Sequence, residues 1–355
     1  MAKHSAFPFQ RPVPLTAVSL VESMQALQAD AWEQHLRSFG ALPYAKALLN
    51  GGASEAELHA PSQRILDSLQ ITAGDWAINQ LWYRTKIVYD VDPTMMRTLA
   101  DMDTSDLLPG GVLHQLPHPN PVFVFTEGHH VLHKDDAPGI LRAMYVTGRR
   151  SDNTLCGTND PDVAQYQLTF NSDLVDKVGN VVDIDSLRIS FALTDDSFTI
   201  RRAIDEVLRN FRWEPLLTDS ASPEEKRQYM ESLVHFGLAH LLYVCSEKAD
   251  TRRRPIGRKP AKKGERPQKP LQVHELGWHV GAAIKSTREL IENDRRSAVA
   301  AGKRTMQPHV RRAHLHTFRH GKGRALSKVK WLPPIFVNAN GDSVNLDGTI
   351  IPVQK

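Results

Sequence analysis

Residues 302–330 concentrate basic and imidazole side chains in one short stretch. The segment holds nine Lys or Arg residues and no Asp or Glu. Along an extended strand, alternate side chains share a face. One face would then carry Arg312, His314, His316, Phe318 and His320. The opposite face would carry Arg311, Ala313, Leu315, Thr317 and Arg319.

These residue types suit a phosphodiester chain. A guanidinium binds phosphate, an aromatic ring stacks on a base, and an imidazole can do either. We therefore expect the segment to meet an anionic partner, with RNA as the preferred interpretation. The predicted nucleic-acid contacts are Arg311, Arg312, His314, His316, Phe318, Arg319, His320, Lys322, Arg324 and Lys330.

Three other interpretations of the segment remain open. His314, His316 and His320 could supply the general acid and base of a metal-independent endoribonuclease, because imidazole titrates near neutral pH. His314 and His316 could instead be two metal ligands on one strand face, completed by a residue from elsewhere. Residues 302–330 contain no carboxylate for such a site, so we expect no metal and no cofactor. The segment could also be a basic hairpin that binds nothing. Binding without catalysis is preferred.

A second histidine-rich stretch lies at residues 127–136. His129, His130 and His133 follow a predicted strand. Their spacing lacks the HExxH order that places a carboxylate base beside a metal. We therefore predict a turn whose histidines are polar surface residues.

Trp331 is the aromatic residue that we expect to contact a partner. It precedes Pro333 and Pro334, which place the strand at a sheet edge or end its pairing. An exposed tryptophan there would offer a peptide-binding surface. The sequence has no GxGxxG, GxxxxGK[ST] or GxSxG motif, which disfavours nucleotide-dependent and hydrolase-elbow chemistry.

Charge is distributed unevenly along the chain. The formal net charge is +4, but residues 251–270 carry +8 and residues 302–330 carry +9. The rest of the chain therefore carries −13. An acidic body with two basic segments favours a polyanionic partner.

The cellular compartment of the protein can be predicted from features that the sequence lacks. Only Cys156 and Cys245 are present, which excludes a disulfide framework. No apolar run has the length of a membrane helix, and the beginning of the sequence has no apolar signal segment. We expect a cytoplasmic protein without a membrane partner, whose oligomeric state stays open.

Hydrophobic periodicity predicts both helices and strands. Helices are expected over residues 16–39, within 61–71, and over 93–102, 199–211 and 222–245. Strands are expected over residues 86–91, 122–125, 141–146, 187–193, 309–318 and 328–337. The last two flank a turn at residues 319–323 and predict a hairpin.

These elements predict an α+β fold. N-terminal helices occupy residues 1–83, an α+β core residues 84–249, and a basic flexible linker or loop residues 250–270. A His/Arg-rich β region follows at residues 271–355. We expect a mixed or antiparallel sheet with helix 222–245 packed on it. The C-terminal β-hairpin should join or extend that sheet.

Two blocks near the end resemble a known family. The sequences PHVRRAHLH at residues 308–316 and VKWLPPIFVN at residues 329–338 are similar to the C-terminal signature of type V-A anti-CRISPR proteins of the translation-dependent kind and of their plasmid and phage relatives. The resemblance implies an inhibitor that recognises the nascent N-terminal polypeptide of a type V-A CRISPR nuclease and lowers its mRNA. The implied partners are that polypeptide and RNA or the translating ribosome. The alternatives are the endoribonuclease and a plasmid-borne nucleic-acid-binding regulator.

Overall fold

The structure, a computed structural model, describes residues 33–34, 36–38, 41–50, 63–103, 107–109, 111–131, 139–152, 154–175, 181–192, 197–210, 222–255, 270–300 and 309–337. Most of the helix predicted over residues 16–39 lies outside these ranges, as does most of the basic segment, residues 256–269.

Helices and strands alternate irregularly along the chain. In order they are α2 (Leu42–Asn50), α3 (Gln63–Thr85), β1 (Ile87–Val91), α4 (Pro93–Ala100), β2 (Leu107–Pro109), η2 (Val112–Gln115), β3 (Val122–Val131), β4 (Gly139–Arg149), β5 (Leu155–Cys156), β6 (Gln165–Val175), β7 (Val181–Phe191), β8 (Ser197–Thr199), α5 (Ile200–Asn210), α6 (Pro223–Cys245), β9 (Thr251–Arg254), β10 (Gln272–Leu276), α7 (Trp278–Ala300), β11 (His309–Arg311), β12 (His314–His320), η4 (Lys322–Arg324), β13 (Leu326–Leu332) and β14 (Ile335–Val337).

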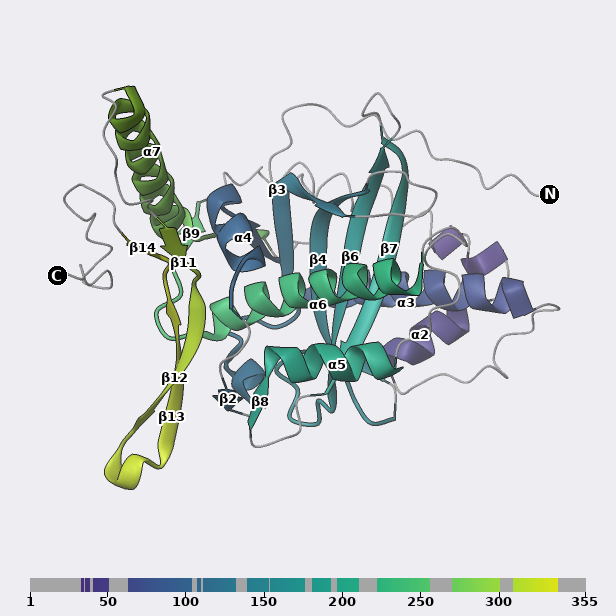
Figure 1. Cartoon of the computed structure of the whole chain (residues 1–355). Coiled ribbons are helices and arrows are strands. Elements are labelled where there is room, and N and C mark those ends of the chain that lie inside the picture. Colours follow the sequence, from purple (N-terminus) through teal and green to yellow (C-terminus); the bar gives the residue numbers. More distant parts are fainter. Residues whose placement is uncertain are drawn as a thin grey trace.

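A mixed sheet forms the centre of the fold, as predicted. Its order is β7-β6-β4-β3-β1-β10-β9, with β5 beside β4. The neighbours β3, β1 and β10 are parallel, and the other pairs are antiparallel. Helices cover both faces, so the α+β prediction is confirmed (Figure 1).

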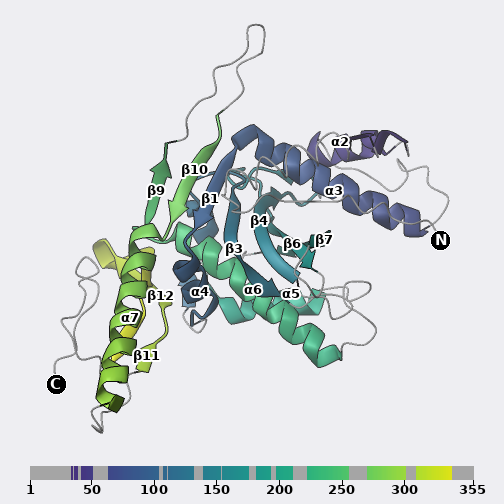
Figure 2. The ribbon, with the colours of Figure 1, turned by 90° about the horizontal axis from the view of Figure 1, so that it is seen from above.

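The two faces of the sheet bury separate hydrophobic clusters. Helices α5 and α6 cover one face, and α2 and α3 cover the other (Figure 2). Neighbouring residues of β1 point to opposite faces: Val88 packs with the α2–α3 cluster, and Tyr89 packs with the α5–α6 cluster. A strand buried on both faces reads as a continuous apolar run, which explains why β1 was recognisable in the sequence.

Helix α6 begins where its sequence predicts. Ser222 is the N-cap, and its hydroxyl accepts from the backbone of Glu225, whose side chain accepts from the backbone of Ser222. Further along, Gly237 lets the helix approach the sheet closely. A Cβ atom there would lie 2.6 Å from Leu168 Cδ1. The helix therefore crosses the sheet tightly before it reaches the C-terminal region.

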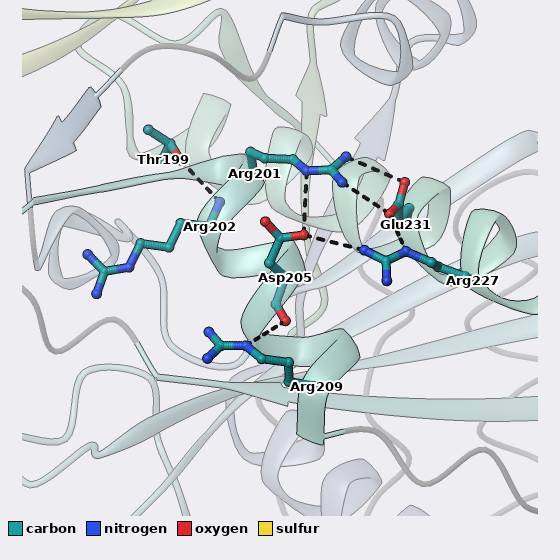
Figure 3. Close-up of polar contacts among 7 residues, drawn as sticks. All are labelled: Thr199, Arg201, Arg202, Asp205, Arg209, Arg227 and Glu231. Atoms are coloured by element: carbon teal, nitrogen blue, oxygen red, sulfur yellow. Dashed lines mark hydrogen bonds and ion pairs between the residues drawn. The ribbon is translucent and has the colours of Figure 1, made fainter. Parts of the chain in front are cut away.

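Charged side chains join α5 to the first half of α6. Arg201 and Arg227 each contact both Asp205 and Glu231, with nitrogen–oxygen distances from 3.1 to 3.8 Å (Figure 3). Since all four groups are partly exposed, each pair is worth at most about 1 kcal/mol. The four charges cancel, so this ring secures α5 on α6 without creating a strongly charged surface.

The first of the two basic segments, residues 251–270, begins with a strand. The prediction of a linker over residues 250–270 is wrong at β9, which pairs antiparallel with β10 at the edge of the sheet. Arg254 pairs with Asp90 at 3.0 Å, and Arg252 donates two hydrogen bonds to Glu275. These partners come from neighbouring strands, and so the segment is held by contacts that its own composition does not reveal.

The C-terminal hairpin does not join the central sheet, contrary to prediction. β12 pairs with β13, and β11 with β14, in two separate two-stranded sheets of the described chain, and a single bridge joins His314 to Asp103. The predicted strand over residues 309–318 is interrupted at residues 312–313, where the Ala313 carbonyl accepts from Asp103 N at 2.9 Å. Pro333 and Pro334 separate β13 from β14, as the sequence predicted.

Two elements extend from the end of the molecule away from α2. Figure 1 shows α7 pointing one way and the β12–β13 hairpin pointing the other. Among the helices that the structure describes, none combines the length and the apolarity that crossing a bilayer would require.

Candidate functional site

The hairpin of β12, η4 and β13 holds most of the predicted contact residues. In its ladder, directly paired residues lie on the same face. The outer face carries His314, His316, Phe318, His320, Leu326, Lys328, Lys330 and Leu332. The inner face carries Leu315, Thr317, Arg319, Ser327, Val329 and Trp331. The predicted alternation is thus confirmed over residues 314–320.

The inner face attaches the hairpin to the body. Leu315 and Val329 are each only 1% exposed and belong to the α5–α6 core cluster. The Thr317 hydroxyl donates to the backbone oxygen of Leu107 at 2.8 Å. Buried apolar side chains and this hydrogen bond therefore fix the hairpin's base, while its outer face stays open.

Trp331 lies on the inner face. Its ring packs edge-on against Tyr243, with centroids 5.1 Å apart, and is half-buried against the core. The prediction of an exposed tryptophan is therefore wrong. The reason is the register, which places Trp331 opposite the buried Leu315. Its buried indole nitrogen has no hydrogen-bond partner among the described residues.

An aromatic ring with polar neighbours forms the middle of the outer face. Phe318 is 37% exposed, and the His316 ring meets it edge-on at a centroid distance of 4.6 Å. Lys330 Nζ lies 5.4 Å from the Phe318 centroid. A partly exposed ring beside an ammonium group and an imidazole is a suitable platform for a nucleobase and its phosphate.

Lys328 belongs to this face but was missed in the sequence. It lies directly opposite Phe318, and its ammonium pairs with Glu247 at 3.1 Å. Lys330 contacts the same carboxylate at 3.5 Å. The alternation of LSKVKWL would have placed Lys328 with Lys330, but only the register places both beside Phe318.

The other predicted contact residues lie apart from this platform. Arg319 is exposed on the inner face near the tip, and Lys322 and Arg324 are exposed in η4. Arg311 is exposed on β11, and Arg312 lies between β11 and β12. The strand is interrupted at Arg312, so the alternation that predicted this residue on the His314 face does not extend to it. The structure therefore brings together His314, His316, Phe318, His320 and Lys330.

The three outer-face histidines do not form a recognisable catalytic arrangement. In the described part of the chain, no hydrogen bond or ion pair joins the side chains of His314, His316 or His320 to another residue that would fix a tautomer. Nor do the described residues contain a group of three His, Cys, Asp or Glu side chains suited to a metal ion. The metal interpretation therefore lacks a third ligand among them.

The histidines of the 127–136 stretch begin inside a strand. The predicted turn is wrong up to Val131, because β3 continues that far; His133 lies outside the described residues. The His129 ring stacks on Phe236 of α6 with centroids 4.5 Å apart. Beside them, the fully buried His240 hydrogen-bonds through Nδ1 to the Phe236 carbonyl at 2.7 Å. His129 thus helps pack α6 on the sheet.

Replacing His240 with leucine should reduce the acid sensitivity of the fold. Burial lowers the pKa of His240 to about 3, whereas an unfolded histidine titrates near 6.5. The stabilising contribution is therefore present above pH 6.5 and is lost as pH falls toward 3. Between pH 7 and pH 5, the unmodified protein should lose about 2 kcal/mol more unfolding free energy than the variant.

Urea unfolding at pH 8, 7 and 5 measures this difference. From pH 8 to pH 7 the difference between the two proteins should stay nearly constant, because the imidazole is largely neutral in both states. Parallel losses of stability down to pH 5 would contradict the assignment of His240 as a buried neutral group.

Arginines of the first basic segment are engaged within the fold. The Arg252 guanidinium lies 3.8 Å from the Trp278 ring centroid while it hydrogen-bonds Glu275. Arg254 is shared between Asp90 and Glu275. The hairpin adds an exposed aromatic ring, Phe318, and exposed cations at its tip, Lys322 and Arg324, so it is the better candidate for a polyanion-binding surface.

Comparisons with known proteins identify similar chains. The AcrVA2-like family, described as the anti-CRISPR type V subtype A2 family, matches residues 89–339. A solved structure titled "Crystal structure of AcrVA2" is similar with a TM-score of 0.50 and 16% sequence identity, covering 90% of this chain and 99% of that chain. At this identity the likeness shows the fold alone. No match was found among curated protein sequences.

Proposed function

Because the chain belongs to the AcrVA2-like family of type V subtype A2 anti-CRISPR proteins, we propose that it inhibits a type V-A CRISPR nuclease during that nuclease's translation. The proposed action is recognition of the nascent N-terminal polypeptide, followed by a loss of the nuclease mRNA. RNA or ribosome contact by the hairpin and peptide contact elsewhere would serve these two steps.

The proposed RNA contact is supported by the composition of the hairpin's outer face. It combines the partly exposed Phe318 with Lys328, Lys330 and His316, and it lies within the residues that the family matches. Stacking on an aromatic ring and contact with phosphate need no particular base sequence. Such a surface suits a protein that selects its target through the encoded polypeptide.

The proposed peptide contact remains Trp331. Its indole N–H is buried and lacks an acceptor in the described chain, although such groups are usually hydrogen-bonded. A peptide carbonyl that reached this nitrogen after a small local movement would satisfy it. The Trp331→Phe variant removes the donor and keeps an aromatic ring beside Tyr243, and its urea midpoint measures how much stability the smaller ring loses.

A cell-free translation assay separates recognition of peptide from recognition of RNA. Two mRNAs encode the first segment of a type V-A nuclease fused to a reporter, one in frame and one shifted by compensating single-nucleotide changes. The nucleotide sequences are nearly identical, but the nascent peptides differ. We expect the protein to lower only the in-frame mRNA, measured by quantitative PCR. Equal loss of both mRNAs, or loss of neither, would contradict the proposal.

A second candidate is a metal-independent endoribonuclease, favoured by the position of His314, His316 and His320 on one accessible face. In that case purified protein alone would cleave labelled RNA in the presence of EDTA. Cleavage should then be lost when His314 and His316 are replaced by alanine. If the purified protein binds RNA but leaves it intact, the mRNA loss requires a separate nuclease.

A further inference from the structure

Glu247 connects the body to the outer face of the hairpin. Its carboxylate lies 3.1 Å from Lys328 Nζ and 3.5 Å from Lys330 Nζ. The hydrogen bond from Lys328 is the largest cause that holds the pKa of Glu247 below its ordinary value. A single anion therefore lies between two cations that extend from the same face of β13.

The backbone holds this anion in place. Glu247 N donates to the Val329 carbonyl at 2.7 Å, which fixes the residue beside β13. Just before it, α6 ends at Cys245, and the Ser246 hydroxyl donates to the carbonyl of Tyr243. The position of the carboxylate thus follows from the end of α6 and does not depend on a flexible side chain alone.

We propose that Lys328 and Lys330 form a phosphate subsite for single-stranded RNA, which the Glu247 carboxylate occupies in the free protein. This inference rests on the proposed RNA contact of the hairpin. A phosphate of the bound strand displaces the carboxylate, while a base of the same strand stacks on Phe318. Glu247 therefore weakens binding of RNA and limits the hairpin to strands that supply both groups.

Geometry and exposure fit this exchange. Lys328 is directly opposite Phe318, and Lys330 Nζ lies 5.4 Å from the same ring. The side chains of both lysines are more than one third exposed, at 36% and 37%, so an incoming phosphate can reach them. Ion pairs with this exposure are weak. Breaking each pair between a lysine and Glu247 should therefore lower the affinity for an RNA phosphate only a few-fold. RNA can therefore displace the carboxylate.

Same-face residues of a strand lie about 6.8 Å apart, twice the rise per residue. Lys328 and Lys330 therefore present two ammonium groups along the direction of the strand. An extended single-stranded RNA lying along the outer face could contact both. One carboxylate neutralises only half of their charge, which leaves a net attraction for the RNA.

The test is the Glu247→Gln variant, with a fluorescein-labelled 12-nucleotide oligo(U) RNA as the probe. Fluorescence anisotropy from 50 to 200 mM salt gives both the affinity and its salt dependence. We expect affinity to rise about 2- to 10-fold, because the competing charge is gone. The slope of log K against log salt should stay about the same, because the same phosphate contacts form in both complexes.

Glu231→Gln is the matched control. Glu231 is also a carboxylate held by two cations, Arg201 and Arg227, but it lies about 20 Å back along α6 (Figure 3). Its replacement should leave RNA affinity unchanged. In addition, Lys328→Gln combined with Lys330→Gln should weaken binding and make the Glu247→Gln change ineffective, since the coupled partners are absent.

The outcomes distinguish this inference from the proposed function. If the unmodified protein binds the RNA and Glu247→Gln binds it equally or more weakly, the subsite is wrong while the RNA contact stands. If neither protein binds at 50 mM salt, the RNA contact itself fails, and the subsite with it. A gain that Glu231→Gln reproduces would reflect net charge and would also overturn the subsite.

Discussion

Replacing Phe318 with alanine is expected to weaken binding of single-stranded RNA by about 1–3 kcal/mol, which corresponds to about 5- to 150-fold in affinity. The ring is 37% exposed, and its neighbours on the outer face are His316 and Lys330. Removing it takes away the stacking surface but leaves the cations. The loss should therefore persist at every salt concentration, with little change in the salt slope.

Fluorescence anisotropy with oligo(U) RNA measures this effect, and Phe318→Tyr is the matched variant. Tyrosine keeps the ring and should retain most of the affinity. Because Phe318 is not part of the buried core, the urea midpoint of Phe318→Ala should stay close to that of the unmodified protein. If alanine and tyrosine bind alike, bases do not stack on this ring, and the outer face acts only through its charges.

Local sequence signals predicted those elements whose determinants are local. The N-cap at Ser222 was recognisable because serine, proline and two glutamates stand together there. The alternation from His314 to His320 was recognisable because Leu315 is the buried residue between polar ones. In both cases, residues within a few positions of one another decide the structure.

Other features depend on residues far apart in the sequence. The break before His314 coincides with a contact between Asp103 and Ala313, and β9 became a strand by pairing with β10. Strand β6 was not predicted, although Tyr166, Leu168 and Phe170 pack in the α5–α6 cluster and alternate with polar residues, which is the pattern of a strand.

Some residues of the candidate site could likewise be predicted from local sequence, and others could not. Four outer-face residues of β12 could be predicted from alternation within one strand. Lys328 required the pairing register between β12 and β13, and Glu247 required the position of the end of α6. A basic composition indicated a polyanion, but only the tertiary structure revealed that a carboxylate of the chain already contacts two of the cations.

Leu315→Ala is expected to lower the free energy of unfolding by about 2–5 kcal/mol. The Leu315 side chain is 1% exposed and lies in the main hydrophobic cluster together with Val329 of the facing strand. Truncation removes apolar contacts and leaves a cavity between the hairpin and the body. Because the inner face is what holds the hairpin, the loss should extend to function, and RNA affinity should fall as well.

Urea unfolding and RNA anisotropy measured on the same samples test this linkage, and Leu326→Ala is the matched control. Leu326 belongs to the same hairpin but is 58% exposed, so an identical truncation should cost less than about 0.5 kcal/mol. Equal stability of the two variants would mean that the inner face is not packed as described. A large loss of stability with unchanged RNA affinity would contradict the expected link between the two. The outer face would then bind RNA whether or not the hairpin is attached to the core.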